Sequence, residues 1–209
     1  MPWVSNRIVL MDRTTQFEEY RAGDVIAWVD ESGSNSAKDP GTYILSAAVC
    51  FAEDIDASRA ATGKLLLRGQ RKLHWINEST QRRRKIIDSI ATLPLEHVVV
   101  VRSHSASRDK PERRRRKCLE RLLIELEALQ VNAAVLESRG PHQDGLDMKM
   151  LSHLRTRHTV SAIRLHHKTG PSDPMLWVPD ACCGAVVDDR CGVPEFFSRI
   201  EEKTTVHLV

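Results

Sequence analysis

The sequence lacks any hydrophobic run long enough to cross a membrane, and it has few aromatic residues. A membrane-spanning helix needs about 20 consecutive apolar residues, and no stretch of the 209 residues approaches that length. The first eleven residues also lack the apolar segment and small-residue cleavage site of a secretory signal. Aromatic residues make up only 5% of the chain and are not interleaved with its basic runs, which argues against a base-stacking platform. We therefore expect a cytoplasmic protein with no membrane partner.

Cysteine is present in an odd number and without paired spacing. None of the five cysteines belongs to a CxxC motif, and the adjacent Cys182 and Cys183 would point in different directions on a helix. A structural zinc site needs four ligands at recognisable spacings, and we find none. We expect reduced, partly buried cysteines in a reducing compartment.

Net charge is small as well, since 31 Lys and Arg residues face 28 Asp and Glu residues for a total of +3. The field of the whole molecule is therefore weak, and local basic patches matter more than the sum. Hydrophobic residues make up 41% and charged residues 28%, an ordinary globular balance that argues against disorder. The length suits one domain. We predict an N-terminal arm at residues 1–23 and a single domain over residues 24–209.

The pattern of apolar residues predicts an α/β fold. β-branched runs predict strands at 24–30, 42–51, 97–101, 131–137 and 159–166, with a short strand at 72–75. Helical spacing and start signals predict helices at 53–67, 80–92, 111–129, 147–157, 176–187 and 194–202. Residues 140–145 are predicted to form a turn. A hairpin followed by alternating strands and helices implies a mixed sheet of about five strands with helices on both faces.

Three carboxylates stand where an apolar element ends or is interrupted. Asp30 follows the first strand, Glu137 ends a later one, and Asp180 lies in an otherwise apolar helix. Acids that converge without a basic partner repel one another, and a divalent cation relieves that repulsion. Hard oxygen ligands suit Mg²⁺ or Mn²⁺. Two such ions about 4 Å apart can hold the attacking water and the leaving oxygen of a phosphodiester, so the pattern favours hydrolysis of a nucleic-acid backbone.

Three motifs of the chain resemble those of the DUF3800 proteins, a bacterial group with a ribonuclease H-like fold. These motifs are Asp30–Ser34 at the end of the first strand, Lys72–Trp75 in the middle, and Leu176–Asp180 before a helix of small residues. In the family the last motif is Leu-Gln-x-Ala-Asp, whereas here Trp177 replaces the Gln and Pro179 the Ala. The resemblance spans about residues 24 to 190.

The resemblance implies that Asp30 and Asp180 are metal ligands and that Glu137 is the third acid, with Asp144 and Asp147 as weaker alternatives for it. One departure affects this expectation. The family often has Glu where this chain has Lys72. If that Glu is normally a ligand, Glu31 or His74 takes its place or the metal binds poorly. Glu31 otherwise points away and caps the turn, which is the alternative we favour.

Other residues are candidates for catalysis or for binding nucleic acid. His74 has an ordinary pKa near neutrality, so it can shuttle a proton or orient a water, although a packed strand residue is the commoner role. Basic runs at residues 82–85 and 113–117 can neutralise phosphates, although charge runs on helices are usually only solvated faces. Lys168, after His166 and His167, can also reach a phosphate, although an exposed loop is favoured there. The residues that we expect to contact nucleic acid are Arg83, Arg84, Arg114, Arg115 and Lys168.

Two functions from different classes follow from these observations. The first is a nuclease or phosphodiesterase-type hydrolase that uses Mg²⁺ or Mn²⁺ at Asp30, Glu137 and Asp180 and acts on RNA or DNA. The second is a non-catalytic nucleic-acid-binding or protein-interaction module on the same ribonuclease H-like fold, which Lys72 and the basic runs favour. Hydrolysis of a small phosphoester is a weaker third. The sequence leaves a monomer or a homodimer open.

Overall fold

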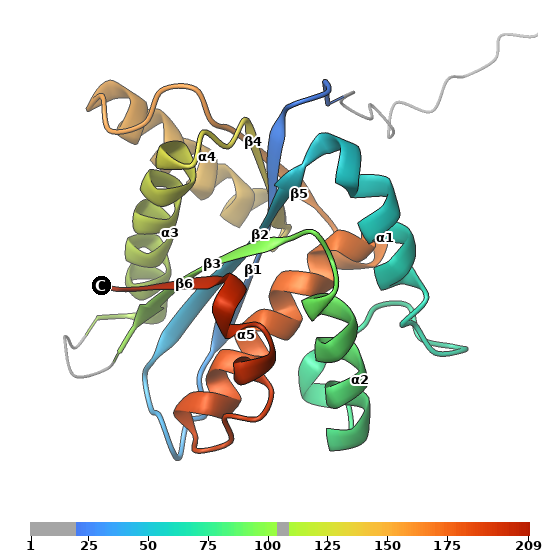
Figure 1. The fold of residues 1–209 in the computed structure, drawn as a ribbon. Helices are drawn as coiled ribbons and strands as arrows, with labels where there is room; N and C mark the ends of the chain where they lie inside the picture. Colours follow the sequence, from blue (N-terminus) through green and yellow to red (C-terminus); the bar gives the residue numbers. More distant parts are fainter. Residues whose placement is uncertain (1–19, 104–108) are drawn as a thin grey trace, which may run out of the picture.

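The computed structural model describes residues 20–103 and 109–209, which form a mixed sheet between two layers of helices (Figure 1). The sheet has six strands in the order β5-β4-β1-β2-β3-β6. The strands are β1 (Val25–Gly33), β2 (Tyr43–Phe51), β3 (Glu96–Arg102), β4 (Ala133–Glu137), β5 (Arg164–Lys168) and β6 (Thr204–Leu208). The helices are α1 (Ile55–Gly63), α2 (Thr80–Ala91), α3 (Pro111–Ala128), α4 (Pro141–Thr156) and α5 (Trp177–Arg190).

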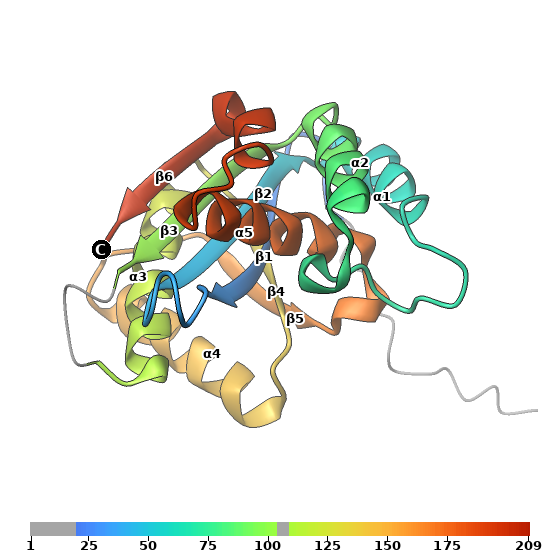
Figure 2. The ribbon, with the colours of Figure 1, turned by 90° about the horizontal axis from the view of Figure 1, so that it is seen from below.

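The strand pairing combines an antiparallel meander with parallel neighbours on both sides. β1 and β2 form the expected hairpin, with Val25 opposite Phe51 and Gly33 opposite Tyr43, and β3 continues the meander. β4 pairs parallel with β1, β5 with β4, and β6 with β3. Because β1 and β4 run in the same direction, their carboxyl ends meet at one end of the sheet. Figure 2 looks at the molecule from that end.

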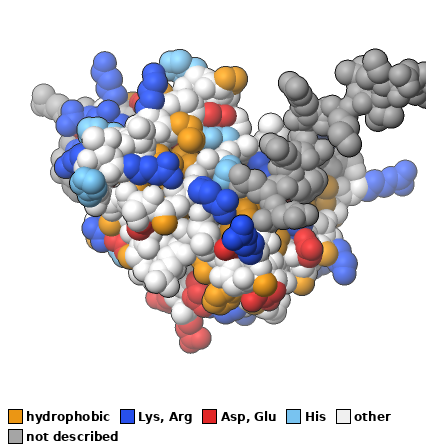
Figure 3. Space-filling view, turned by 90° about the horizontal axis from the view of Figure 1, so that it is seen from above, with side chains coloured by type: hydrophobic (Ala, Val, Ile, Leu, Met, Phe, Trp, Pro, Cys, Tyr) orange, Lys and Arg blue, Asp and Glu red, His pale blue; other side chains and the backbone are white. Residues whose placement is uncertain are grey.

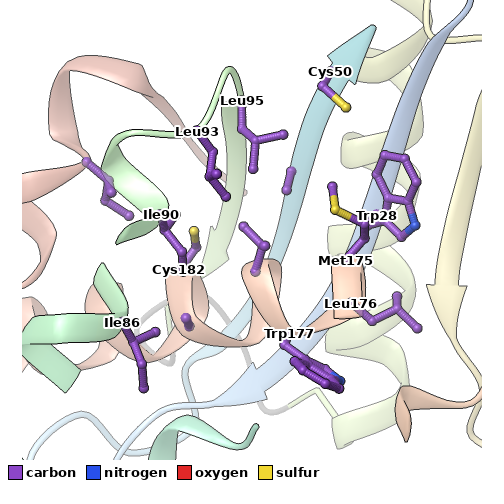
Figure 4. Close-up of a cluster of buried hydrophobic side chains, with 14 of the residues drawn as sticks. Trp28, Cys50, Ile86, Ile90, Leu93, Leu95, Met175, Leu176, Trp177 and Cys182 are labelled. Carbon is purple, nitrogen blue, oxygen red and sulfur yellow. The ribbon is translucent and has the colours of Figure 1, made fainter. Parts of the chain in front are cut away.

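Alternate residues of the strands supply two separate hydrophobic layers, because successive side chains of a strand point to opposite faces. On one face Ile26 and Trp28 of β1 pack against α1, α2 and α5. Figure 4 shows this layer, with Trp28 beside Met175 and Ile90 of α2 near Cys182. On the other face Ala27 and Val29 pack against α3 and α4. The position of a residue along β1 therefore decides which helices it meets.

Local signals explain where several helices begin. The Ser79 side chain accepts a hydrogen bond from the backbone N–H of Arg82, as expected of a helix N-cap, and α2 starts at the next residue. Pro111 occupies the first position of α3, where its missing N–H costs nothing. Pro141 does the same in α4, and Gly140 before it has a φ of 103°, a conformation that glycine adopts most readily.

The structure corrects several predicted elements. The sheet has six strands instead of about five, because residues 204–208 form β6, and the helix predicted at 194–202 is replaced by short 3₁₀ turns at Phe197–Arg199 and Glu201–Lys203. Residues 72–75 do not form a strand but lead into a 3₁₀ turn, Trp75–Asn77. The turn predicted at 140–145 is the start of α4. β1 continues to Gly33, beyond the turn predicted after Asp30.

The strand predicted at 159–166 begins only at Arg164, and the helix predicted at 147–157 begins already at Pro141. The other predicted helices and strands are found within a few residues of their expected bounds. Most of the predicted N-terminal arm lies outside the described residues. None of the described helices is long and apolar enough to cross a membrane.

Candidate active site

The register between β1 and β4 brings the first two predicted acids together. Ile26 is level with Ala133 and Val29 with Leu136. One residue further along, Asp30 and Glu137 come next to each other, where β4 ends and β1 continues to Gly33. Both follow the alternation that faces α5, and the Glu137 carboxylate lies against the backbone of Gly170, where a side chain would collide with it.

Helix α5 carries the third acid to the same end of the sheet. The helix packs across β1, and the Cys183 thiol lies 3.6 Å from the carbonyl oxygen of Asp30. Asp180 is in the first turn of α5, where a carboxylate is favoured by the helix dipole. Its Oδ2 accepts a hydrogen bond from the backbone N–H of Trp75 at 2.8 Å, and its Oδ1 lies 3.1 Å from His74 Nδ1. The structure thus brings Asp30, Glu137, Asp180 and His74 together at one place.

The three carboxylates carry an excess of negative charge. Asp30 is only 8% exposed. Burial raises the pKa of its carboxyl well above the ordinary value, and the negative charges of Glu137 and Asp180 raise it further. Lys72 and a hydrogen bond from the backbone N–H of Glu31 act in the opposite direction but do not cancel the rise. The end of β1 is therefore a position that attracts cations.

The Lys72 ammonium lies among these acids. Its Nζ is 2.7 and 2.5 Å from the two carboxylate oxygens of Glu137 and 3.9 Å from Oδ2 of Asp30. Burial lowers the pKa of Lys72, but the hydrogen bond to Glu137 and the charges of the nearby carboxylates outweigh it and raise the pKa above its ordinary value. Lys72 is therefore a bound, charged counter-ion of the site.

His74 is more open than the carboxylates, with 49% of its side chain exposed. Its hydrogen bond with Asp180 raises its pKa, against the effect of partial burial. An imidazole that is held by a carboxylate at one nitrogen is oriented to exchange a proton through the other. This geometry is consistent with the predicted shuttle.

Trp75 anchors the segment that carries Lys72 and His74. Its ring packs against Gly184 of α5, where a β-carbon would overlap the indole. Its Nε1 donates to Asp188 at 3.0 Å, and the Arg83 guanidinium lies over the ring, 5.3 Å from its centre. A glycine in α5 thus permits the close approach that fixes the lysine and the histidine.

A groove of about 690 Å³ adjoins Asp180. One wall comes from the β1–β2 connection, another from the segment around Trp75, and the rest from α5 and Arg83; His74 and Asp180 of the site are in its lining. The connection is held by Asp39, which accepts hydrogen bonds from Arg190, Ser34 and Thr42 that lower its pKa to about 2. The groove therefore has defined walls and leads to Asp180.

Glu31 belongs to a second ionic cluster on the opposite face of the sheet. Its Oε2 accepts a hydrogen bond from Arg115 Nε at 2.5 Å, and Arg139 lies 3.6 Å from Oε1. Arg115 also binds Asp147 with both terminal nitrogens, and His167 lies 3.1 Å from the same carboxylate. Burial raises the pKa of Asp147, but its hydrogen bonds with His167 and Arg115 hold it below the ordinary value.

This cluster corrects two sequence-based expectations. Glu31 points away from the three acids, as favoured, but it binds Arg115 on the side of α3 and α4 and does not cap a turn. Asp147 is held on that side as well. Arg115 is only 3% exposed, and its guanidinium is shared between two carboxylates. A phosphate in solution does not reach such a group, so Arg115 is not a surface contact for nucleic acid.

The other predicted basic contacts are exposed to different degrees. Arg83 is paired with Asp188 at the groove, and Arg84, with a side chain that is 57% exposed, is paired with Glu195. Arg114 donates to the carbonyl of Gly41, and Lys168 lies 3.3 Å from Asp173 at the end of β5 rather than in a loop. On the opposite end of the molecule, basic side chains are interspersed with acidic and uncharged ones (Figure 3).

The three carboxylates fit a divalent cation by their chemistry. They offer hard oxygen atoms. Burial is the main cause of the raised pKa of Asp30, and the charges of Glu137 and Asp180, which raise it further, are ones that a cation would offset. Within residues 20–103 and 109–209, however, no three His, Cys, Asp or Glu side chains are close enough together to hold a metal ion. The carboxylates are arranged around the Lys72 ammonium instead.

Comparison with known proteins identifies the fold. No protein-family model matches the chain, and no curated protein matches its sequence. Among solved structures, ribonuclease HII of Archaeoglobus fulgidus in its PCNA complex is similar at a TM-score of 0.54 and 15% identity, over 86% of this chain and 77% of that one. The chain has a ribonuclease H-like fold.

Two further structures support this conclusion. Ribonuclease H2 of Pyrococcus horikoshii OT3 has a TM-score of 0.52 at 11% identity, over 86% of this chain and 76% of that one. Bst-RNase HIII in complex with Mn²⁺ has a TM-score of 0.50 at 14% identity, over 87% of this chain and 54% of that one. Identities this low establish the fold and not the activity. Membership of the DUF3800 family stays a prediction.

Sequence reasoning found the acids but missed the position of Lys72. It treated this lysine only as a departure from a family pattern, whereas in the structure the Lys72 ammonium contacts Glu137 and Asp30. It also missed Gly184, whose role depends on the Trp75 ring packed against it. The orientation of Glu31 could have been predicted from the sequence, because neighbouring side chains of a strand point to opposite faces and Glu31 directly follows Asp30.

Proposed function

We propose that this protein hydrolyses phosphodiester bonds of RNA or DNA at Asp30, Glu137 and Asp180, with Mg²⁺ or Mn²⁺ as cofactor. The observation that carries the proposal is the convergence of these carboxylates from β1, β4 and α5 beside an open groove. The ribonuclease H-like fold supports it, since the similar solved structures are ribonucleases and one of them is a Mn²⁺ complex.

In this proposal the carboxylates bind the cation and His74 transfers the proton. Asp30, Glu137 and Asp180 would hold the cation, which when bound polarises the phosphate and the attacking water. Asp180 also holds His74 through Nδ1, which leaves Nε2 to give a proton to the leaving oxygen. The raised pKa of His74 keeps the imidazole protonated at a higher pH than usual, which suits a general acid.

The groove provides the binding surface for the polynucleotide in this proposal. Its walls are polar on the side of the β1–β2 connection, and Arg83 is in its lining. Arg84, Arg114 and Lys168 would contact phosphates further from the acids, each contact adding to the salt dependence of binding.

A cleavage assay tests the proposal. Labelled RNA, DNA and hybrid substrates are incubated with Mn²⁺, Mg²⁺ or chelator. We expect cleavage that the chelator abolishes and that Asp30→Asn and Asp180→Asn reduce by about 100-fold or more. Asp56→Asn is the matched control, because this exposed carboxylate lies on α1 away from the site. Cleavage that is indifferent to both substitutions at the site would refute the proposal.

Lys72 favours a second candidate, a module that binds nucleic acid without cleaving it. An ammonium that already compensates the acids makes a bound metal less necessary for the fold. This alternative predicts tight binding that weakens steeply with salt, with no turnover in any metal. Metal-dependent cleavage that is lost in Asp30→Asn excludes it.

A further inference from the structure

The contacts of Lys72 go beyond those of an ordinary surface ion pair. Its ammonium makes two short contacts to Glu137 and a longer one to Asp30, and only 20% of its side chain is exposed. The charge of Asp180 acts on it as well. Lys72 therefore contacts two of the three carboxylates directly, Glu137 and Asp30.

The count of charges shows that Lys72 satisfies the site only in part. When the three carboxylates are ionised, one ammonium offsets one of their three negative charges. His74 is bonded to Asp180 at the outer side of the site. The effect of Lys72 on the pKa of Asp30 is smaller than the opposing effects of burial and of the two neighbouring acids. The site thus keeps a net negative charge that one more cation would offset. Both carboxylate oxygens of Glu137 are already bound to Lys72, so fewer oxygen atoms are left to bind that cation.

The backbone at Lys72 is fixed, whereas the end of the side chain is held only by ionic contacts. Leu73 is 1% exposed, and Trp75 is locked against Gly184. Beyond the backbone, a flexible four-carbon stem carries the ammonium. The lysine can exchange partners without a change in the fold.

We propose that the Lys72 ammonium takes the place of one divalent cation, so that Lys72 determines how many metal ions the centre binds and how tightly. Glu137 is the carboxylate for which Lys72 and the metal compete, so the ion pair with Lys72 weakens the hold of Glu137 on the cation. A chain without this ammonium would offer Glu137, Asp30 and Asp180 together. The inference rests on the site of the proposed function, but its test measures cation binding and not cleavage.

Isothermal calorimetry with Mn²⁺ compares the wild-type chain with Lys72→Met and Lys72→Arg. We expect Lys72→Met to gain one equivalent of Mn²⁺ or to bind it at least about tenfold more tightly, because Glu137 becomes available. Lys72→Arg keeps the positive charge and should bind as the wild type does. Lys117→Met is the matched control, since this lysine lies on α3, which packs on the opposite face of the sheet from α5, and is paired with Asp109.

Thermal unfolding with and without Mn²⁺ gives a second readout. Removal of the ammonium leaves the acids without their counter-ion, so Mn²⁺ should raise the melting temperature of Lys72→Met more than that of the wild type. Lys72→Gln replaces Lys72→Met in both measurements if the methionine variant does not unfold cooperatively.

Three results would overturn the inference. These are unchanged stoichiometry and affinity on removal of the ammonium, an equal gain in Lys72→Arg, and an equal gain in Lys117→Met. A failure of the proposed function looks different, since a protein that cleaves nothing can still show the gain of Mn²⁺ in Lys72→Met. Conversely, if the protein cleaves nucleic acid but its metal affinity is the same with and without the Lys72 ammonium, the proposed function stands and this inference is refuted.

Discussion

Replacement of Arg115 by methionine should destabilise the protein strongly. Arg115 is 3% exposed and binds two carboxylates, one of which, Asp147, is also 3% exposed. Removal of one partner from a buried ion pair leaves the other as an uncompensated charge, which costs about 3–5 kcal/mol. Domains of this kind have about 5–15 kcal/mol of stability in total. Arg115→Met should therefore lose a large part of the free energy of unfolding.

Urea denaturation followed by circular dichroism measures this loss as a lower midpoint with an unchanged slope. Arg113→Met is the control, because Arg113 is on the same helix, its side chain is 60% exposed, and it pairs with Asp109 at i−4. An exposed pair of this kind contributes at most about 1 kcal/mol.

A second variant separates the lost ion pair from lost packing. In the double variant Arg115→Met/Asp147→Leu the buried charge is gone, so part of the stability should return. A cost of less than about 1 kcal/mol for Arg115→Met alone would refute the reasoning, and so would a double variant that is no more stable than the single one.

Three further predictions follow from the structure. Burial, with a smaller effect of Lys203, lowers the pKa of His97 to about 4 in the native state. As the pH falls, the unfolded chain therefore binds the proton before the native protein does. The contribution to stability is complete above about pH 6.5 and is lost as the pH drops towards 4, by up to about 3 kcal/mol. Urea denaturation at several pH values measures this slope, and a His97→Leu variant with the same slope would contradict the assignment. Gly184→Ala should cost about 1–3 kcal/mol and reduce cleavage, because its methyl group displaces the Trp75 ring; denaturation and the nuclease assay measure both, and full activity would count against it. Ser79→Ala should cost about 1 kcal/mol and Ser79→Gly only a few tenths, as measured by denaturation, and equal costs would argue against a capping role.

The sequence predicts the sheet and the acids well where the signal is local. β-branched runs identify β3, and the hairpin of β1 and β2 follows from two apolar segments around a turn. The carboxylates at the ends of apolar elements identify Asp30, Glu137 and Asp180. In each case the residue type and its neighbours in sequence carry the information.

Prediction fails where a distant contact decides the structure. β6 has mostly exposed side chains and forms because β3 offers an unpaired edge. The segment at 140–145 has the composition of a turn, but Asp144 accepts hydrogen bonds from Ser138 and from the backbone of Arg139, and these help to start α4. The role of Lys72 likewise depends on Glu137, which is 65 residues away.

The short distance between Lys72 and His74 has a consequence for how the segment can vary. His74 has extended backbone angles, and Leu73 between the two is turned into the core. In an extended segment only every second side chain shares a side. An inserted or deleted residue between Lys72 and Trp75 would therefore present leucine to the carboxylates and send a charged group inward. Single substitutions in this segment can change the side chains that meet the carboxylates, but a change in its length would disrupt the site.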